Sequence, residues 1–409
     1  MKRGFLASAS VNLFANTTAS ILSAASMLIV IRTLSITDWG HTAALLGGGQ
    51  LLGSVLSFGT PARLIRELSV LRTAAYKRNA YILTLARSLT GAVIMAIGLL
   101  LFVFYSPDIG SFVVLGAGVF VSLGSTVGFI SRRRYVAAAA VLLSEKASAL
   151  LSLMVLAGFH SLTPAIFCCV LGITGLIAGF LASIFLRRSH TNPRVLKTAA
   201  RRQWFGTLHF GIAAVAPSFL LLDTVIVAHV CGASEAGAYA VGSRLLAPLS
   251  VVSTTLAQTL MPILAVYGPA ARIPFPTARR WVFGVVAVIS VVLVLITVAP
   301  GVAVWSLGSE YSASAWPIRF FILNAAAVLV TRALVTALQA WRHESLASIL
   351  IGANVLLALM AVLFGASVGG AGAAAAGVFV ANIVLAISLV VSTQHVRQRS
   401  LVTASPAGL

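Results

Sequence analysis

The chain has 409 residues, of which 59% are hydrophobic and 9% charged, and its mean hydropathy is +1.04. Such a composition excludes a soluble globular domain. A transmembrane β-barrel is excluded as well, because its strands would show alternating apolar and polar residues instead of long apolar runs. The formal net charge of +20 would indicate nucleic-acid binding in a soluble protein. Here the Lys and Arg residues recur in clusters between apolar runs, so we expect no nucleic-acid partner.

Twelve apolar runs are long enough to cross a bilayer as helices, since a span needs about 20 predominantly apolar residues. We predict them at Ser10 to Thr33, Thr42 to Phe58, Ala80 to Tyr105, Ser111 to Ile130, Ala140 to Phe159, Thr163 to Leu186, Thr207 to Val230, Gly237 to Tyr267, Trp281 to Trp305, Trp316 to Ala340, Ser345 to Gly365 and Gly370 to Val391. The first run follows Lys2 and Arg3, as a secretory signal would. It stays apolar as far as Ile31, so we predict an uncleaved first helix.

The basic residues gather in alternate loops, the set that includes the N-terminus. Arg132 to Arg134 and the segment from Arg187 to Arg202 belong to this set, whereas the other loops carry Asp38 and Asp108. Because positively charged loops stay in the cytoplasm, this alternation predicts an even number of spans with both termini cytoplasmic.

An internal repeat divides the chain into two halves. Ile29 to Leu34, followed by Asp38-Trp39-Gly40, returns 197 residues later as Ile226 to Cys231, followed by Glu235-Ala236-Gly237. Duplicated bundles around a central cleft are a transporter architecture. We therefore predict an all-α integral membrane protein of about twelve helices, with a six-helix bundle at 1–186, a basic cytoplasmic linker at 187–206, a second bundle at 207–391 and a cytoplasmic tail at 392–409.

Five short segments, in this order along the chain, resemble a known family. They are Ile31 to Gly40, Ser57 to Glu67, Ala236 to Leu245 with the later Met261-Pro262, Leu307 to Tyr311, and Gly369 to Ala374. Together they are similar to the polysaccharide biosynthesis or O-antigen flippases of the multidrug/oligosaccharidyl-lipid/polysaccharide (MOP) exporter superfamily. The stretches Gly59 to Glu67 and Gly308 to Tyr311 resemble the polysaccharide branch.

The resemblance implies a transporter that moves a polyprenyl-pyrophosphate-linked oligosaccharide from the inner to the outer leaflet of the bacterial cytoplasmic membrane. Its partners would be membrane lipid, the polyprenyl-linked saccharide, and a glycan polymerase or glycosyltransferases. The superfamily also contains drug and cation exporters, which is the first alternative function. A membrane glycosyltransferase or ligase is the second alternative.

Ionisable side chains inside spans are costly, so each is a candidate site residue. They are Arg32, Arg87, Glu145, Lys146, Asp223, Arg244, Arg319 and Arg332. Arg32 and Arg319 lie near span ends, from which an Arg side chain can also reach the interface. Arg87 could likewise reach the cytoplasmic surface. Glu145 and Lys146 lie a few residues inside their predicted span, and they either pair with each other or with basic loops.

Polar stripes on three spans complete the candidate set. Arg244 is accompanied at helical spacing by Gln258, and Arg332 begins a shorter stripe on the tenth span, while Asn12 and Asn16 lie on the first. We predict Arg244, Arg332, Arg87, Arg32, Gln258, Asn12 and Asn16 as substrate-cavity residues, and Asp223 and Glu145 as ion-coupling residues. Arg244 either lines a cavity or forms a structural pair with Asp223. The excess of Arg favours an anion such as pyrophosphate, which guanidinium binds with two parallel hydrogen bonds.

Nothing in the sequence points to a catalytic site. The predicted external loops are short, and each holds a single carboxylate rather than an acid and base constellation. No phosphate loop, dinucleotide fingerprint, metal cluster or nucleophile motif appears. We therefore predict no enzyme activity and no cofactor. We expect the three cysteines, Cys168, Cys169 and Cys231, to be packing residues.

Overall fold

The computed structural model describes residues 2–61, 73–131, 134–186, 215–245, 253, 294–341 and 343–404. Within these residues every element is helical and there is no strand. The chain forms two compact units, Met1–Gly237 and Ala238–Leu409. Seven of the described helices are long and apolar enough to cross a membrane, and the segments Val215–Cys231 and Val294–Leu307 are shorter apolar helices.

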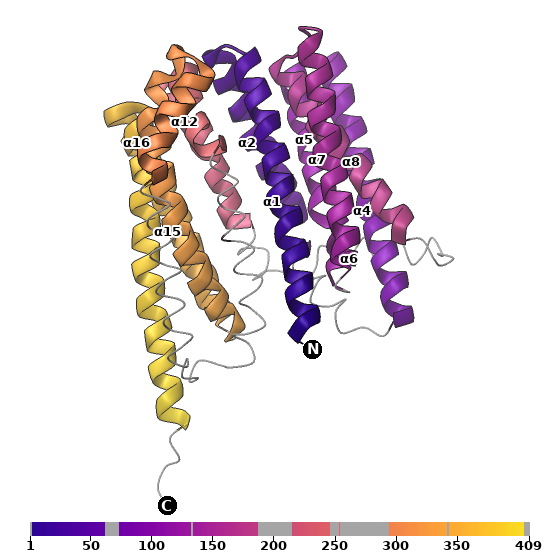
Figure 1. Ribbon diagram of the computed structural model, residues 1–409, viewed down its shortest axis with the longest axis vertical. Helices are drawn as coiled ribbons and strands as arrows, with labels where there is room; N and C mark the ends of the chain where they lie inside the picture. Colours follow the sequence, from indigo (N-terminus) through magenta and orange to yellow (C-terminus); the bar gives the residue numbers. More distant parts are fainter. Residues whose placement is uncertain are drawn as a thin grey trace, which may run out of the picture. The chain divides into compact units, whose positions relative to one another are not determined.

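The first unit is a bundle built around one central helix. Its elements are α1 (Lys2–Thr33), α2 (Ile36–Ser57), α4 (Thr73–Phe104), α5 (Pro107–Ser125), α6 (Val127–Ile130), α7 (Tyr135–Gly158), α8 (Pro164–Leu186), η1 (Leu220–Leu222) and α11 (Asp223–Cys231). The helix α5 packs against α2, α4 and α8, while α1 packs against α7 (Figure 1). Consistent with this central position, the span Pro107–Ile130, formed by α5 and α6, has a larger share of its apolar stretch buried than any other described span of the unit.

Small residues let α5 and α8 approach each other closely. A Cβ added to Gly118 would lie 2.2 Å from the carbonyl oxygen of Gly172, and one added to Gly172 would lie 2.4 Å from that of Val114. Inside a membrane, helices associate through such backbone contact rather than through the hydrophobic effect. The glycines of this helix pair therefore set the interaxial distance at the centre of the bundle.

The two copies of the sequence repeat meet where α2 and α12 (Ala233–Leu245) begin. A Cβ on Gly40 would lie 2.0 Å from the carbonyl oxygen of Ala233, and one on Gly237 would lie 2.3 Å from that of Ile36. Ile36 and Ala233 are equivalent residues of the repeat, as are Gly40 and Gly237, so each contact is the image of the other. The starts of these two helices thus cross with no room for a side chain on either glycine.

The start of α2 also explains the acidic residue of the repeat. Ser35 is the N-cap of α2, where its Oγ accepts a hydrogen bond from the Asp38 backbone N–H at 3.1 Å and donates one to the Asp38 carboxylate at 2.8 Å. The first bond satisfies one of the backbone N–H groups that a helix start leaves open, and the second holds the Asp38 carboxylate against the cap. Asp38 is therefore a helix-start residue.

The second unit contains the end of α12, η2 (Ser309–Ser314), α15 (Ala315–Ala340) and α16 (Glu344–Ala404). The element α16 is two helices joined at Gly369 and Gly370, where the backbone is not helical and Gly370 has a φ of 65°. That φ favours glycine. Close contacts of Gly365 with Ala373 and of Gly377 with Ala361 show that the two arms fold back as a hairpin. The hairpin packs against α15 (Figure 1).

A chain of three amides crosses this unit from helix to helix. The Asn354 Nδ2 donates to the Asn382 Oδ1 at 3.3 Å, and the Asn382 Nδ2 donates to the Asn324 Oδ1 at 2.8 Å. Asn354 and Asn382 belong to the two arms of α16 and are buried, while Asn324 belongs to α15. The chain fixes the register of the hairpin on α15.

We expect Asn382→Leu to lower the stability of the second unit by about 2 kcal/mol, because it breaks two interhelical hydrogen bonds and leaves two amides with fewer partners. Thermal unfolding of the detergent-solubilised protein measures this loss. Ser388→Ala is the matched control on the same arm, since the exposed Ser388 hydroxyl bonds only its own helix, at Val384. Equal stability of the two variants would show that the amide chain contributes nothing.

The predicted all-α membrane fold is confirmed. The described part of each predicted span is helical, apart from short turns and span ends such as Thr126. Several helices begin earlier than predicted. The helix α2 starts at Ile36 rather than Thr42, because its capped polar first turns precede the apolar run, and α7 starts at Tyr135 rather than Ala140, because the apolar residues from Tyr135 to Ala139 are also helical. The predicted linker at 187–206 lies outside the described residues. The predicted tail is helical from residue 392 to Ala404.

Candidate functional site

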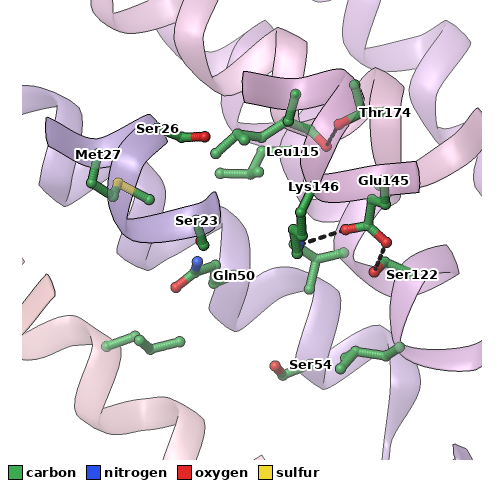
Figure 2. Close-up of a pocket in the computed structure, with 17 residues that line it drawn as sticks. Ser23, Ser26, Met27, Gln50, Ser54, Leu115, Ser122, Glu145, Lys146 and Thr174 are labelled. Atoms are coloured by element: carbon green, nitrogen blue, oxygen red, sulfur yellow. Dashed lines mark hydrogen bonds and ion pairs between the residues drawn. The ribbon is translucent and has the colours of Figure 1, made fainter. Parts of the chain in front are cut away.

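The first unit contains a partly open cavity of about 310 Å³ among its helices. The wall is formed by side chains of α1, α2, α5, α7 and α8, and by Leu221 of η1. Its polar members are Ser23, Ser26, Gln50, Ser54, Ser122, Glu145, Lys146 and Thr174. Figure 2 shows Ser23 and Gln50 together on one side of the space, across from Glu145 and Ser122. The cavity therefore collects polar groups from five helices in the interior of an apolar bundle.

A short hydrogen-bonded chain forms the charged part of the wall. The Ser122 hydroxyl on α5 donates to the Glu145 Oε2 at 2.7 Å, and the Lys146 Nζ donates to the Glu145 Oε1 at 2.6 Å (Figure 2). The Glu145 side chain is 5% exposed and that of Lys146 31%. Both carboxylate oxygens thus have a donor, and the carboxylate charge is compensated by its sequence neighbour. This confirms the predicted alternative in which Glu145 and Lys146 pair with each other.

The pair lies deeper in the bundle than the sequence predicted. The helix α7 begins at Tyr135, so Glu145 comes ten residues after its start, about 15 Å along the axis. The predicted depth was too small because the span was started at Ala140, although the residues from Tyr135 to Ala139 are also apolar and helical. A charge at this depth is expensive in lipid, which explains why both members face protein and each other.

The remaining polar groups divide into donors and acceptors. Ser26 donates to the Leu22 carbonyl at 2.9 Å and Thr174 to the Val170 carbonyl at 3.0 Å, so these hydroxyls offer only lone pairs to the cavity. The side-chain hydroxyls of Ser23 and Ser54 make no hydrogen bond with the described part of the chain, so they remain available. The Lys146 ammonium carries three N–H donors, and its bond to Glu145 uses one.

Arg87 lies away from the cavity lining, at the junction of three helices. Its Nε donates to the Phe120 carbonyl and its Nη2 to the Ser57 Oγ, each at 2.5 Å, and the guanidinium lies over the Phe120 ring at 4.1 Å. The side chain is 3% exposed. Arg87 therefore joins α2, α4 and α5. It lies neither at the surface nor next to the other candidate residues.

The other predicted site residues of the first unit are dispersed. Arg32 is exposed in the last turn of α1, where a cation is favourable for the helix dipole. Asn16 is half-buried on α1 and does not line the cavity. Asp223 is buried as the first residue of α11, and its Oδ1 accepts hydrogen bonds from the Thr224 backbone N–H and hydroxyl. The side chain of Asn12 lies outside the described residues.

In the second unit the structure gives the positions of two predicted arginines. Arg244 is half-buried in the last turn of α12, and Arg332 is exposed in the middle of α15. Arg319, near the start of α15, covers the Trp316 ring at 4.9 Å. Gln258 lies outside the described residues. The assignment of Arg244, Arg332 and Gln258 to a substrate cavity stays a prediction.

Sequence reasoning missed most of the cavity wall. Of the predicted site residues, Glu145 lines the cavity, next to Lys146, a candidate to which no role was assigned, while Gln50, Ser54 and Ser122 were not selected. The adjacent acid and base in the middle of α7 were the available signal for Lys146. Single Ser and Gln residues in glycine-rich apolar helices carry no comparable signal, since such residues often form only helix-to-helix hydrogen bonds.

Comparison with known proteins shows the fold. No family model and no curated protein matches the sequence. Among solved structures, a multidrug resistance MATE family transporter of the MOP superfamily, facing inward, superposes with a TM-score of 0.64 at 14% identity, covering 98% of this chain and 100% of that one. The lipid II flippase MurJ, in an inward closed conformation, gives 0.63 at 10% identity, covering 95% and 90%.

A third similar structure is a MOP superfamily transporter from Pyrococcus furiosus, which is described as having a binding pocket of reverse polarity. It gives a TM-score of 0.56 at 13% identity and covers 95% of this chain and 98% of that one. All three proteins are transporters. The chain therefore has the fold of MOP superfamily transporters, a multi-pass membrane fold, over almost its whole length.

Proposed function

We propose that this chain is a transporter that moves a polyprenyl-pyrophosphate-linked oligosaccharide from the inner to the outer leaflet of the bacterial cytoplasmic membrane by alternating access. The fold is shared with a lipid flippase and with drug exporters, so the fold alone does not select the cargo. The charge balance of the cavity in the first unit is the observation that supports this cargo.

That cavity offers no uncompensated negative charge to a cationic drug. Its one carboxylate in the described wall, Glu145, already bonds Lys146 and Ser122 through its two oxygens. A site for an organic cation needs an open carboxylate or an aromatic face, because a desolvated cation must be neutralised. The wall instead presents hydroxyls, an amide and an ammonium, which are the groups that bind neutral or anionic oxygen-rich cargo.

The remaining parts of the proposal follow the distribution of charge. Arg244 and Arg332 would bind the pyrophosphate, which suits the paired donors of guanidinium. Both termini and the basic loops would lie in the cytoplasm, as the alternation of Lys and Arg clusters predicts. The proposed partners are membrane lipid and the glycosyltransferases or polymerase that make and use the cargo, and no catalytic step is assigned to the chain.

A vesicle assay tests this function against drug export. Purified protein is reconstituted with a polyprenyl-pyrophosphoryl disaccharide carrying a fluorophore on the sugar, and an impermeant reductant reports how fast the label crosses. We expect the protein to accelerate crossing of this lipid well beyond protein-free vesicles, and to leave ethidium efflux at the protein-free rate. Ethidium transport without lipid crossing would instead establish the drug exporter alternative.

A further inference from the structure

The wall of the first-unit cavity offers both hydrogen-bond donors and hydrogen-bond acceptors. A ligand with a single charged group could not bond all of them. Ser23 and Ser54 provide available hydroxyls, and Lys146 provides further N–H groups beyond its bond to Glu145. Ser26 and Thr174 provide acceptor lone pairs, since their protons bond their own helices. A ligand that fits this wall must itself donate and accept at several points.

The charges of the wall argue for an uncharged ligand. Glu145 and Lys146 cancel each other, and Glu145 is almost fully buried beside the cavity. A phosphate approaching Lys146 would also approach this carboxylate, and the repulsion would offset the attraction of the ammonium. A cation would meet the Lys146 ammonium in the same way. A sugar hydroxyl can instead donate to Glu145 and accept from Lys146 without a change of charge.

The apolar part of the wall fits the same class of ligand. Met27, Leu115, Val119 and Leu221 complete the lining between the polar groups. A pyranose ring has carbon-bound hydrogens on its faces and hydroxyls around its edge, so it needs both kinds of contact. The volume of about 310 Å³ is near the lower limit of ordinary ligand pockets, which suits a small sugar unit and not a lipid tail.

We infer that this cavity binds the saccharide part of the cargo, with Glu145 accepting from and Lys146 donating to neighbouring sugar hydroxyls, while the pyrophosphate is held elsewhere. This inference rests on the proposed function and adds that separate parts of the protein bind the saccharide and the pyrophosphate. It predicts that the Glu145–Lys146 pair contributes to affinity for the sugar and not for the polyprenyl pyrophosphate.

The test compares lipids with and without sugar on the full chain in nanodiscs. The probes are polyprenyl pyrophosphate alone and the same lipid carrying N-acetylglucosamine, glucose or galactose, with Kd measured by thermophoresis. The variant is the double change Glu145→Gln with Lys146→Met, which removes both charges together and leaves no orphaned ion. Thr84→Val is the matched control, because the buried Thr84 hydroxyl bonds only Ala80 of its own helix and does not line the cavity.

In the wild type and in Thr84→Val we expect at least one glycosylated lipid to bind about tenfold more tightly than the bare lipid. In the double variant this difference should vanish, while the Kd of the bare lipid stays within about twofold. A sugar-dependent difference that survives the double change would overturn the inference, as would its absence from the wild type or an equal loss of affinity for bare lipid. Failure of the wild type to bind any of the four lipids would instead refute the proposed function.

Discussion

Gly40→Ala and Gly237→Ala are each expected to destabilise the first unit by about 3 kcal/mol and to abolish transport. The added methyl carbon would lie 2.0 Å from the Ala233 carbonyl oxygen in the first case and 2.3 Å from the Ile36 carbonyl oxygen in the second. Both obstacles are backbone atoms, so no side-chain rotation relieves the clash and the two helix starts must separate. Thermal unfolding in detergent and the vesicle assay measure the two effects.

The same substitution at Gly352 is the control for these variants. Gly352 lies within the first arm of α16 and a Cβ there would meet nothing within 4 Å, so Gly352→Ala should be neutral or slightly stabilising through helix propensity. Because the two contacts are images of each other under the repeat, the variants at Gly40 and Gly237 should behave alike. A stable and active Gly40→Ala protein would mean that α2 and α12 do not cross at this distance.

Lys146→Met is the second substitution with a large expected effect. It leaves the Glu145 carboxylate buried with Ser122 as its remaining donor, and we expect a loss of about 2 kcal/mol of folded stability, since an orphaned charge is costly in a low-dielectric interior. The double change Glu145→Gln with Lys146→Met should recover most of this loss, because it removes the ion pair as a whole. The comparison is made by thermal unfolding of the two detergent-solubilised variants.

Two results would contradict this account of the pair. A Lys146→Met protein as stable as the wild type would show that Glu145 does not depend on the ammonium. A double variant no more stable than Lys146→Met would show that the side chain of Lys146 matters for packing and not for charge. Recovery of stability in the double variant would show that this variant is folded, which is the condition for using it in the binding test.

The fold could be predicted because it depends on features that are local in the sequence. Apolar length marks the spans, and the 197-residue repeat identified Gly40 and Gly237 as equivalent residues. That these two glycines meet across a helix crossing could not be predicted, since a sequence repeat does not give the distance between its copies. The same limit applies to the Asn354, Asn382 and Asn324 chain, which depends on the register of three helices.

The site was harder to predict because a charged residue inside the membrane can have either a structural role or a functional one. Arg87 satisfies the criteria for a cavity residue from sequence alone, yet it bonds Phe120 and Ser57 at a helix junction. Asp223 likewise bonds the start of its own helix through Thr224. Glu145 was predicted as an ion-coupling residue and lines the cavity, where its carboxylate is paired with Lys146; the ion-coupling role stays a prediction.

The most direct test of the proposed cargo site is photolabelling with a lipid-linked saccharide that carries a diazirine on the sugar, followed by peptide mapping of the full chain in membranes. The account predicts adducts on the cavity walls of α2 and α7, near Ser54 and Lys146, that excess unlabelled lipid-linked saccharide prevents and a lipophilic cation does not. Adducts that avoid these walls, or that the lipophilic cation prevents, would contradict it.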